Sequence, residues 1–163
     1  MNNPSNPILA PATPADVPAI LDFIRKLAQY ERLSHTVTAT EADLQKHLFG
    51  PTPAAEVILA KIDANPVGFA LYFTTFSTFV GRPGIWLEDL FVLPEFRHRG
   101  IGRSLLRAVA ATAVQRNCGR LEWSVLDWNQ PAIQLYQKLG AVAMSDWTIQ
   151  RLTGEALAQL ASG

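Results

Sequence analysis

The residues best suited to chemistry lie in one stretch, from Leu87 to Arg103. It reads as an apolar strand, a turn at Pro94, a basic loop and the first residues of a helix. The first amides of a helix have no acceptor within it, and Gly100 and Gly102 let a ligand approach the backbone closely. Together with three arginines, this pattern predicts a phosphate-binding loop. Taken alone, it equally fits an ordinary helix start with solvated arginines.

Two adjacent carboxylates, Glu88 and Asp89, lie in the otherwise apolar strand predicted over residues 85–93. A continuous apolar run is typical of a central strand that is buried on both faces. Charged groups in such a strand need either a partner or a function. Successive strand residues point to opposite faces, so only one of the two should face a substrate unless the strand is bulged there.

Composition favours one soluble domain. The chain has 163 residues, 48% of them hydrophobic, which suffices for one substantial core. Its 14 basic residues balance 14 acidic ones, which argues against a nucleic-acid or membrane partner. The single cysteine, Cys118, and the lack of a signal peptide pattern fit a cytoplasmic protein. The histidines are scattered, so no metal site is expected. Residues 1–7 are expected to form a disordered tail, and residues 8–163 a single domain.

Sequence patterns in the N-terminal half predict two helices followed by a β-hairpin. Thr13 is a predicted N-cap for a helix that ends near Tyr30, and Thr40 for a shorter second helix. Residues 56–62 and 67–75 are rich in β-branched and aromatic residues and are joined by a turn sequence. They predict an antiparallel hairpin.

The C-terminal half predicts a strand, helix and strand in succession. Apolar residues at helical spacing extend from Ile101 to about Arg116, and residues 121–126 alternate as a strand. Two strands joined by such a helix are parallel neighbours. A further helix is expected after Asn129. Residues 141–152 are expected to form a last strand before a short C-terminal helix.

Several motifs resemble those of a known enzyme family. Arg97-x-x-Gly100-x-Gly102 resembles the acetyl-coenzyme A motif of the GNAT N-acetyltransferase superfamily, and the stretch from Asn129 to Ala141 resembles its second signature. The resemblance covers nearly the whole chain and implies an α/β GNAT fold. This is a single mixed, mostly antiparallel central sheet with a parallel pair at the cofactor site, flanked by helices. The diamine and thialysine acetyltransferase branch is similar at Pro11 to Asp16, Leu27 to Glu31, Val67 to Thr74, Leu87 to Asp89 and Asp127 to Gln130.

Carried over by position, the resemblance assigns the cofactor-binding and catalytic residues. It implies acetyl-CoA as the co-substrate and Tyr136 as the general acid that protonates the leaving thiolate. By spacing alone, Tyr136 is a core residue of its helix. The residues that would bind the cofactor are Leu90, Phe91, Val92, Arg97, His98, Arg99, Gly100, Ile101, Gly102, Arg103 and Asn129.

An amine substrate must lose a proton before it attacks. For an alkylamine with a pKa of about 10.4, this costs roughly 4 to 5 kcal/mol at neutral pH. An unpaired carboxylate in a buried strand has a raised pKa, which makes it a better base. Glu88 is therefore the candidate base, acting directly or through a water molecule. Glu88 or Asp89 could instead be a structural carboxylate bonded to backbone amides. The resemblance adds Tyr30 and Glu31 as contacts to the far ammonium group of a substrate, alongside Glu88 and Asp89.

The sequence thus leads to one hypothesis and two alternatives. The hypothesis is direct acetyl transfer from acetyl-CoA to a primary amine of a small molecule, a diamine, polyamine or thialysine-like compound, since no activated nucleophile is evident. The alternatives are acetylation of a protein or peptide amine, and a non-catalytic acetyl-CoA sensor. The resemblance also implies a homodimer. Ala10 and the stretch from Thr75 to Phe79 depart from polyamine-specific members, which weakens the case for spermidine.

Overall fold

The computed structural model describes residues 7–163, so residues 1–6 of the predicted tail lie outside the described part. The chain divides into two compact units. The first ends at Ser124, and the second runs from Val125 to Gly163.

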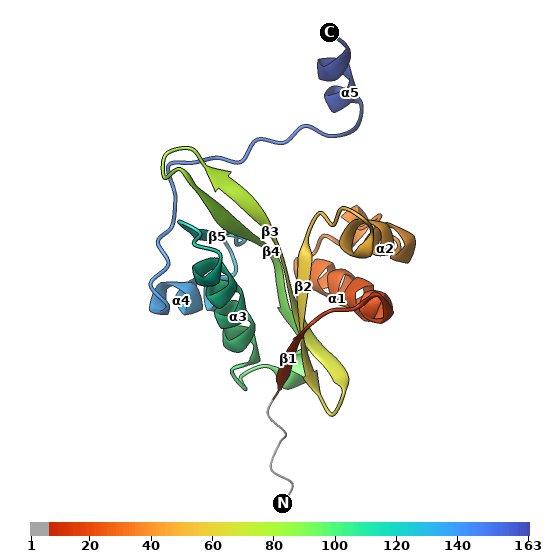
Figure 1. Cartoon of the computed structure of the whole chain (residues 1–163), viewed down its shortest axis with the longest axis vertical. Helices are drawn as coiled ribbons and strands as arrows, with labels where there is room; N and C mark the ends of the chain where they lie inside the picture. The colour runs from red at the N-terminus through yellow and green to blue at the C-terminus, as the bar shows by residue number, and fades with distance from the viewer. Residues whose placement is uncertain (1–6) are drawn as a thin grey trace, which may run out of the picture. The chain divides into compact units, whose positions relative to one another are not determined.

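A five-stranded mixed sheet forms the centre of the first unit (Figure 1). The first four strands pair antiparallel, and the last pairs in parallel with the fourth. This confirms the predicted sheet and its parallel pair. The third and fourth strands are longer than predicted because their pairing continues into the polar loop between them. The strands lie in chain order: β1 (Ile8–Pro11), β2 (Glu56–Ile62), β3 (Asn65–Ser77), β4 (Arg82–Val92) and β5 (Leu121–Trp123).

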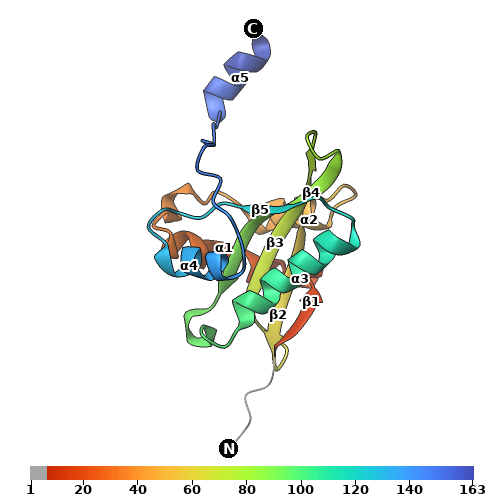
Figure 2. The ribbon, with the colours of Figure 1, turned by 90° about the vertical axis from the view of Figure 1, so that its left-hand side faces the viewer.

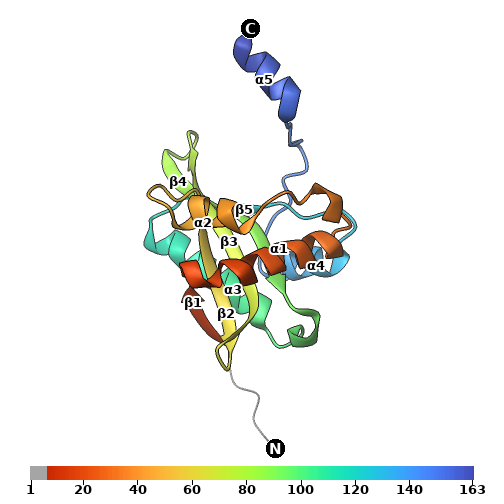
Figure 3. The ribbon, with the colours of Figure 1, turned by 90° about the vertical axis from the view of Figure 1, so that its right-hand side faces the viewer.

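Helices cover both faces of this sheet. α1 (Val17–Tyr30) and α2 (Glu41–Phe49) lie on one face, and α3 (Ile101–Gln115) lies on the other (Figures 1, 2 and 3). Thr40 is the N-cap of α2, as predicted, whereas Thr13 caps the short helix η1 that leads into α1, and the N-cap of α1 itself is Asp16. The backbone N–H of Thr13 donates to Asp16 at 2.8 Å, and that of Thr40 donates to Asp43 at 2.9 Å. Such caps stabilise a helix start by about 1 kcal/mol. The remaining short turns are 3-10 helices: η1 (Pro14–Asp16), η2 (Ser34–Thr36) and η3 (Pro94–Phe96).

Aromatic packing between α1 and the sheet holds β4 in place. The rings of Phe23 and Phe69 stack with centroids 5.5 Å apart, and Phe91 of β4 lies 6.2 Å from Phe23. Each large side chain buried in this way stabilises the fold by about 1.5 to 3 kcal/mol. The strand that carries the candidate site is therefore anchored in the core. The same cluster contains Ile20, Val57, Leu59 and Leu71.

The second unit contains two helices, α4 (Gln130–Lys138) and α5 (Gly154–Ser162), joined by an irregular extended stretch (Figure 1). The strand predicted over residues 141–152 is wrong. An extended chain is stable as a strand only when its backbone groups pair with a neighbour, and the described residues of this unit contain no strand. Large side chains of the stretch are exposed as a result, including Val142 at 82% and Trp147 at 74%.

Candidate active site

β4 has an unpaired edge beside the predicted cofactor loop. Its parallel pairing with β5 covers residues 85–87 only, whereas its antiparallel pairing with β3 continues to the end of the strand. Along residues 88–92, the described strands therefore border β4 on one side only. Backbone groups on such an edge can bind an extended ligand that adds itself to the sheet. This edge includes residues 90–92, where the resemblance puts the pantetheine arm.

The loop after β4 leaves the start of α3 uncapped. Gly100 is the N-cap residue, has a left-handed φ of 77° and provides no side chain to cap the helix. The amides of Ile101, Gly102 and Arg103 therefore lack acceptors within the helix. A Cβ atom on Gly100 would meet no heavy atom within 4 Å, so there is open space beside its backbone. His98 also has a positive φ, of 62°, a strained conformation of the kind found at ligand-binding loops. These features suit an anion.

Arg97 contacts two elements, β4 and α1, and is half-buried. Its Nε donates to the carbonyl of Val92 at 3.0 Å. Its guanidinium carbon lies 5.0 Å from the centre of the Tyr30 ring and 5.4 Å from that of the Phe91 ring. Both distances are in the range of cation–π contacts. The side chain therefore links the loop to the end of β4 and to the end of α1.

Arg99 and Arg103 differ from Arg97 in their surroundings. Both side chains are exposed, and the Arg99 guanidinium lies 5.2 Å from the ring of Phe96 within the same loop. Hydrogen bonds from arginine to phosphate are charge-assisted and stronger than neutral ones. These two residues are the better candidates for side-chain contacts to a phosphate.

A β-bulge in β4 lies at the predicted carboxylate pair. The register between β3 and β4 shifts there, so that Leu87 and Asp89 have partners on β3 and Glu88 has none. The strand is thus bulged where the sequence left that question open. Glu88 is exposed, and its carboxylate accepts a hydrogen bond from Trp86 Nε1 at 2.8 Å. Trp86 was not predicted as a site residue, although its position two residues before Glu88 on the strand is a usable signal.

Asp89 has the environment that the sequence suggested for Glu88. Burial, with the negative charges of Glu88 and Glu31, raises the pKa of Asp89 from 3.8 to about 7. Burial also raises the pKa of Glu31, the residue that ends α1. The expectation of a mostly buried Glu88 is wrong, because the bulge turns this side chain outward. The structure nevertheless brings Glu31 and Glu88 within electrostatic reach of Asp89. A carboxyl with a pKa near 7 is well matched to accepting a proton.

The second unit contains the two other predicted residues. Asn129 is the N-cap residue of α4, as predicted, but its side chain does not form the capping hydrogen bond. Tyr136 lies on the same helix and is half-buried. Gly140 follows with a left-handed φ of 89°, which ends the helix as expected. The predicted helix is confirmed, and the roles of both residues toward the cofactor stay predictions.

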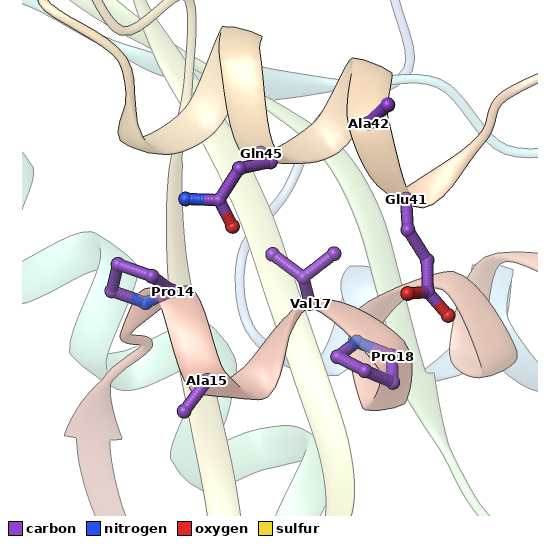
Figure 4. A pocket seen from close by; sticks show the side chains of 7 residues that line it. All are labelled: Pro14, Ala15, Val17, Pro18, Glu41, Ala42 and Gln45. Carbon is purple, nitrogen blue, oxygen red and sulfur yellow. The ribbon is translucent and has the colours of Figure 1, made fainter.

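A surface groove of about 380 Å³ lies between η1, the start of α1 and α2 (Figure 4). The side chains of Glu41 and Gln45 extend from α2 toward Val17 and Pro18 of α1. None of the predicted site residues lines this groove, so it is separate from the candidate active site. Its lining consists of Pro14, Ala15, Val17, Pro18, Glu41, Ala42 and Gln45.

Metal-ligand clusters and membrane-spanning helices are both absent from residues 7–163. Within that range, no three His, Cys, Asp or Glu side chains gather in a group that could hold a metal ion. Nor does any helix of the described chain combine the length and apolar character needed to cross a membrane.

Known proteins are similar to this chain in sequence and in fold. Thialysine N-epsilon-acetyltransferase of Bos taurus is 40% identical in an alignment of length 161, which covers 92% of this chain and 94% of the bovine protein. L-ornithine N5-acetyltransferase of Arabidopsis thaliana is 34% identical in an alignment of length 191, which covers 90% of this chain and 84% of the plant protein. Among solved structures, an integron cassette protein from the mobile metagenome of V. cholerae has a TM-score of 0.81 and 25% identity, with 98% of this chain and 99% of that chain covered.

The family match includes both predicted motifs. Residues 20–141 match the Acetyltransferase (GNAT) family, a range that contains the carboxylate pair, the glycine loop and the whole of the second signature. This range is well over half of the chain, and the relatives above are similar along nearly all of it. The protein therefore belongs to the GNAT family of acetyltransferases.

Proposed function

We propose that this protein transfers the acetyl group of acetyl-CoA directly to a primary amine of a small molecule. The observation that supports this most is the order of features along one strand. The bulged carboxylate pair comes first, the unpaired edge of β4 follows, and the uncapped start of α3 comes last. From Asp89 to the end of β4 the strand rises about 10 Å. A ligand with its phosphates at α3 and its arm along β4 would thus present its far end near the carboxylates.

The proposed chemistry uses the carboxylates at one end of this path together with Tyr136, the general acid that the family resemblance implies. Asp89 accepts a proton from the alkylammonium substrate, helped by the charges of Glu31 and Glu88, which attract the cation. The amine lone pair then forms a C–N bond with the acetyl carbon, and the C–S bond breaks. Tyr136 donates a proton to the leaving thiolate and is reprotonated by the second proton that the nitrogen loses as the amide forms. One proton is released overall, as the charged amine becomes a neutral amide.

The choice of acceptor is supported by the relatives. The names of the bovine and plant proteins describe acetylation of an amino acid whose side chain ends in a primary amine. A substrate of that kind, or a diamine or polyamine, carries a second charged group. Glu31, with Tyr30 before it, is the proposed contact for an ammonium group at the far end. Three carboxylates near one another favour a cationic substrate over an anionic one.

A panel of amines tests this proposal. Release of coenzyme A from acetyl-CoA should be fastest with thialysine, ornithine, lysine or a diamine, and slower with a lysine-containing peptide. Preferred turnover of the peptide would point instead to a protein or peptide acceptor. Tight binding of acetyl-CoA by calorimetry, with no turnover of any amine, would favour a sensor without catalytic activity.

A second copy of the chain is the proposed partner. The stretch from residue 141 to the C-terminus carries large exposed apolar side chains, which commonly mark an association surface. Sedimentation velocity should therefore show a dimer at micromolar concentration. Replacement of Trp147 by Ser should shift the protein toward the monomer, because an exposed tryptophan is a common anchor of interfaces. A monomer at all concentrations of the unaltered protein would reject the dimer.

A further inference from the structure

Arg97 is in the cofactor motif, but its observed contacts are directed elsewhere. Its Nε is bonded to the carbonyl of Val92, the last residue of β4, at 3.0 Å. Its guanidinium is 5.4 Å from the ring of Phe91, on the strand proposed to hold the pantetheine arm. The same group is 5.0 Å from the ring of Tyr30, on α1. One half-buried side chain therefore contacts a residue more than sixty positions away in the sequence.

The contact with Tyr30 lies next to the proposed acceptor site. Tyr30 is the last residue of α1, and Glu31 ends the helix with its backbone N–H donating to Leu27 at 2.9 Å. The last turn of α1 contains no basic residue of its own. A cation near the carbonyl end of a helix is favourable, and Arg97 can supply it. The position of Glu31 therefore depends on a turn that Arg97 contacts through the ring of Tyr30.

Arg99 provides an internal comparison. It has the same charge and lies two residues further along the same loop, and its guanidinium also lies near a ring, 5.2 Å from Phe96. That ring belongs to η3, within the loop itself. The ring contact of Arg99 thus stays within the loop, whereas the contacts of Arg97 reach both β4 and α1.

We infer that Arg97 is a positioning residue that couples the coenzyme A loop to Glu31, so that acetyl-CoA binding strengthens the binding of the amine. This inference rests on the proposed function. When phosphates order the loop, the guanidinium is held against Tyr30 and the last turn of α1 is fixed. The motif alone suggests a different role, in which Arg97 is a ligand of the phosphates.

Steady-state kinetics separate these two roles. Arg97→Met keeps the length of the side chain and removes its charge and its donors. We expect it to raise the KM for the amine about tenfold, equivalent to 1.4 kcal/mol, while the Kd for acetyl-CoA changes less than threefold. Arg99→Met, the matched loss of charge, should weaken acetyl-CoA binding and leave the amine KM within twofold. A tenfold weaker acetyl-CoA affinity for Arg97→Met, with an unchanged amine KM, would overturn the inference.

A second set of variants tests the route through Tyr30. Tyr30→Leu removes the ring that Arg97 contacts, and Tyr30→Phe retains it. The leucine variant should raise the amine KM more than the phenylalanine variant does. The double variant Arg97→Met with Tyr30→Leu should be no worse than the poorer single variant, because both remove one contact. Arg97→Lys should recover part of the loss, since a lysine cation can also lie over a ring. Strict additivity of the two single effects would contradict the coupling.

Hydrogen exchange tests the coupling without any turnover. Coenzyme A should slow amide exchange in residues 28–33 of the unaltered protein and of Arg99→Met, but not of Arg97→Met. Binding of coenzyme A without this protection would overturn the coupling and leave the proposed function standing. Failure of coenzyme A to bind at all would overturn both. If Arg97→Met unfolds, Tyr30→Leu carries the same comparison, because the Tyr30 side chain is 37% exposed and its loss costs little packing.

Discussion

The two units of this protein differ in where their large apolar side chains lie. Every buried hydrophobic residue of the described chain falls between Val17 and Ala113, in the first unit. The second unit contributes none and exposes side chains along its whole length. Its exposed large hydrophobic residues are Trp128, Leu139, Val142, Met144, Trp147, Ile149, Leu152, Leu157 and Leu160.

This difference separates stability from activity. The first unit has a core of its own, which anchors β4 and the carboxylates, whereas the described residues of the second unit include no buried hydrophobic residue. The proposed general acid, Tyr136, nevertheless belongs to the second unit. Mutations in the first unit should therefore change the free energy of unfolding, and mutations in the second should change turnover with little change in that free energy.

The strongest test of this separation is Tyr136→Phe. Loss of the phenolic proton donor should lower turnover by about two to four orders of magnitude, because the thiolate then leaves without general acid assistance. The unfolding free energy should change by less than about 0.5 kcal/mol, since no buried core residue is altered. Coenzyme A release and urea unfolding measure the two quantities. An unchanged rate would make Tyr136 a packing residue of α4 only.

Phe69→Ala, in contrast to Tyr136→Phe, should mainly change stability. Phe69 is fully buried and stacks on Phe23, so its truncation should reduce the unfolding free energy by about 3 to 5 kcal/mol. Leu157→Ala, at a side chain that is 53% exposed in the second unit, is the matched control and should change it by no more than about 0.5 kcal/mol. Urea unfolding followed by circular dichroism compares them. Equal losses for both variants would show that the second unit shares the core of the first.

Asp89→Asn tests a residue of the first unit that should affect both stability and activity. In the folded protein the pKa of Asp89 is raised from 3.8 to about 7, so the folded state binds more protons between these values than the unfolded state does. The contribution of Asp89 to stability is therefore fully present below about pH 4 and lost as the pH rises through 7, by at most about 4 kcal/mol. The Asn variant should lack this decline. Unfolding curves at a series of pH values measure it.

The activity of the same variant sharpens the assignment of the base. Turnover of the unaltered protein should rise with pH to a plateau above about pH 7, because only the ionised carboxylate accepts a proton. Asp89→Asn should lower turnover at neutral pH and remove this inflection. Glu88→Gln is the matched control and should keep the inflection. If Glu88→Gln removes it instead, the exposed carboxylate is the base, as the sequence suggested.

Sequence patterns predicted the local structure well because local structure depends on local chemistry. The caps at Thr13 and Thr40 are set within one turn of chain. What the sequence did not predict depends on distant partners. The sequence of residues 141–152 indicates only that the stretch could pair, and pairing needs a neighbouring strand.

Dependence on distant partners also explains why the sequence did not predict the surroundings of Glu88 and Arg97. The exposure of Glu88 depends on a register shift with β3, which no feature of β4 alone reveals. The contact between Arg97 and Tyr30 joins residues that are distant in the chain. Motif spacing therefore identified the residues of the candidate site, and tertiary packing decided which carboxylate is buried and what the arginine contacts.

The smallest expected effect concerns Gly100, in the loop between β4 and α3. Its φ of 77° is unfavourable for an L-residue, and an added Cβ would meet nothing within 4 Å. Gly100→Ala should therefore destabilise the first unit by about 1 kcal/mol through backbone conformation alone. Gly102 is the matched control, because its added Cβ would lie 3.7 Å from Val92, an ordinary contact.

Gly102→Ala should thus leave the unfolding free energy unchanged within about 0.5 kcal/mol. If phosphates approach the backbone of α3 as proposed, however, the new methyl group should weaken acetyl-CoA binding several-fold. Calorimetric titration with acetyl-CoA, alongside urea unfolding, separates the two glycines. Unchanged acetyl-CoA affinity in Gly102→Ala would place the phosphates away from the first turn of α3, and the proposed path along β4 would then need a different end.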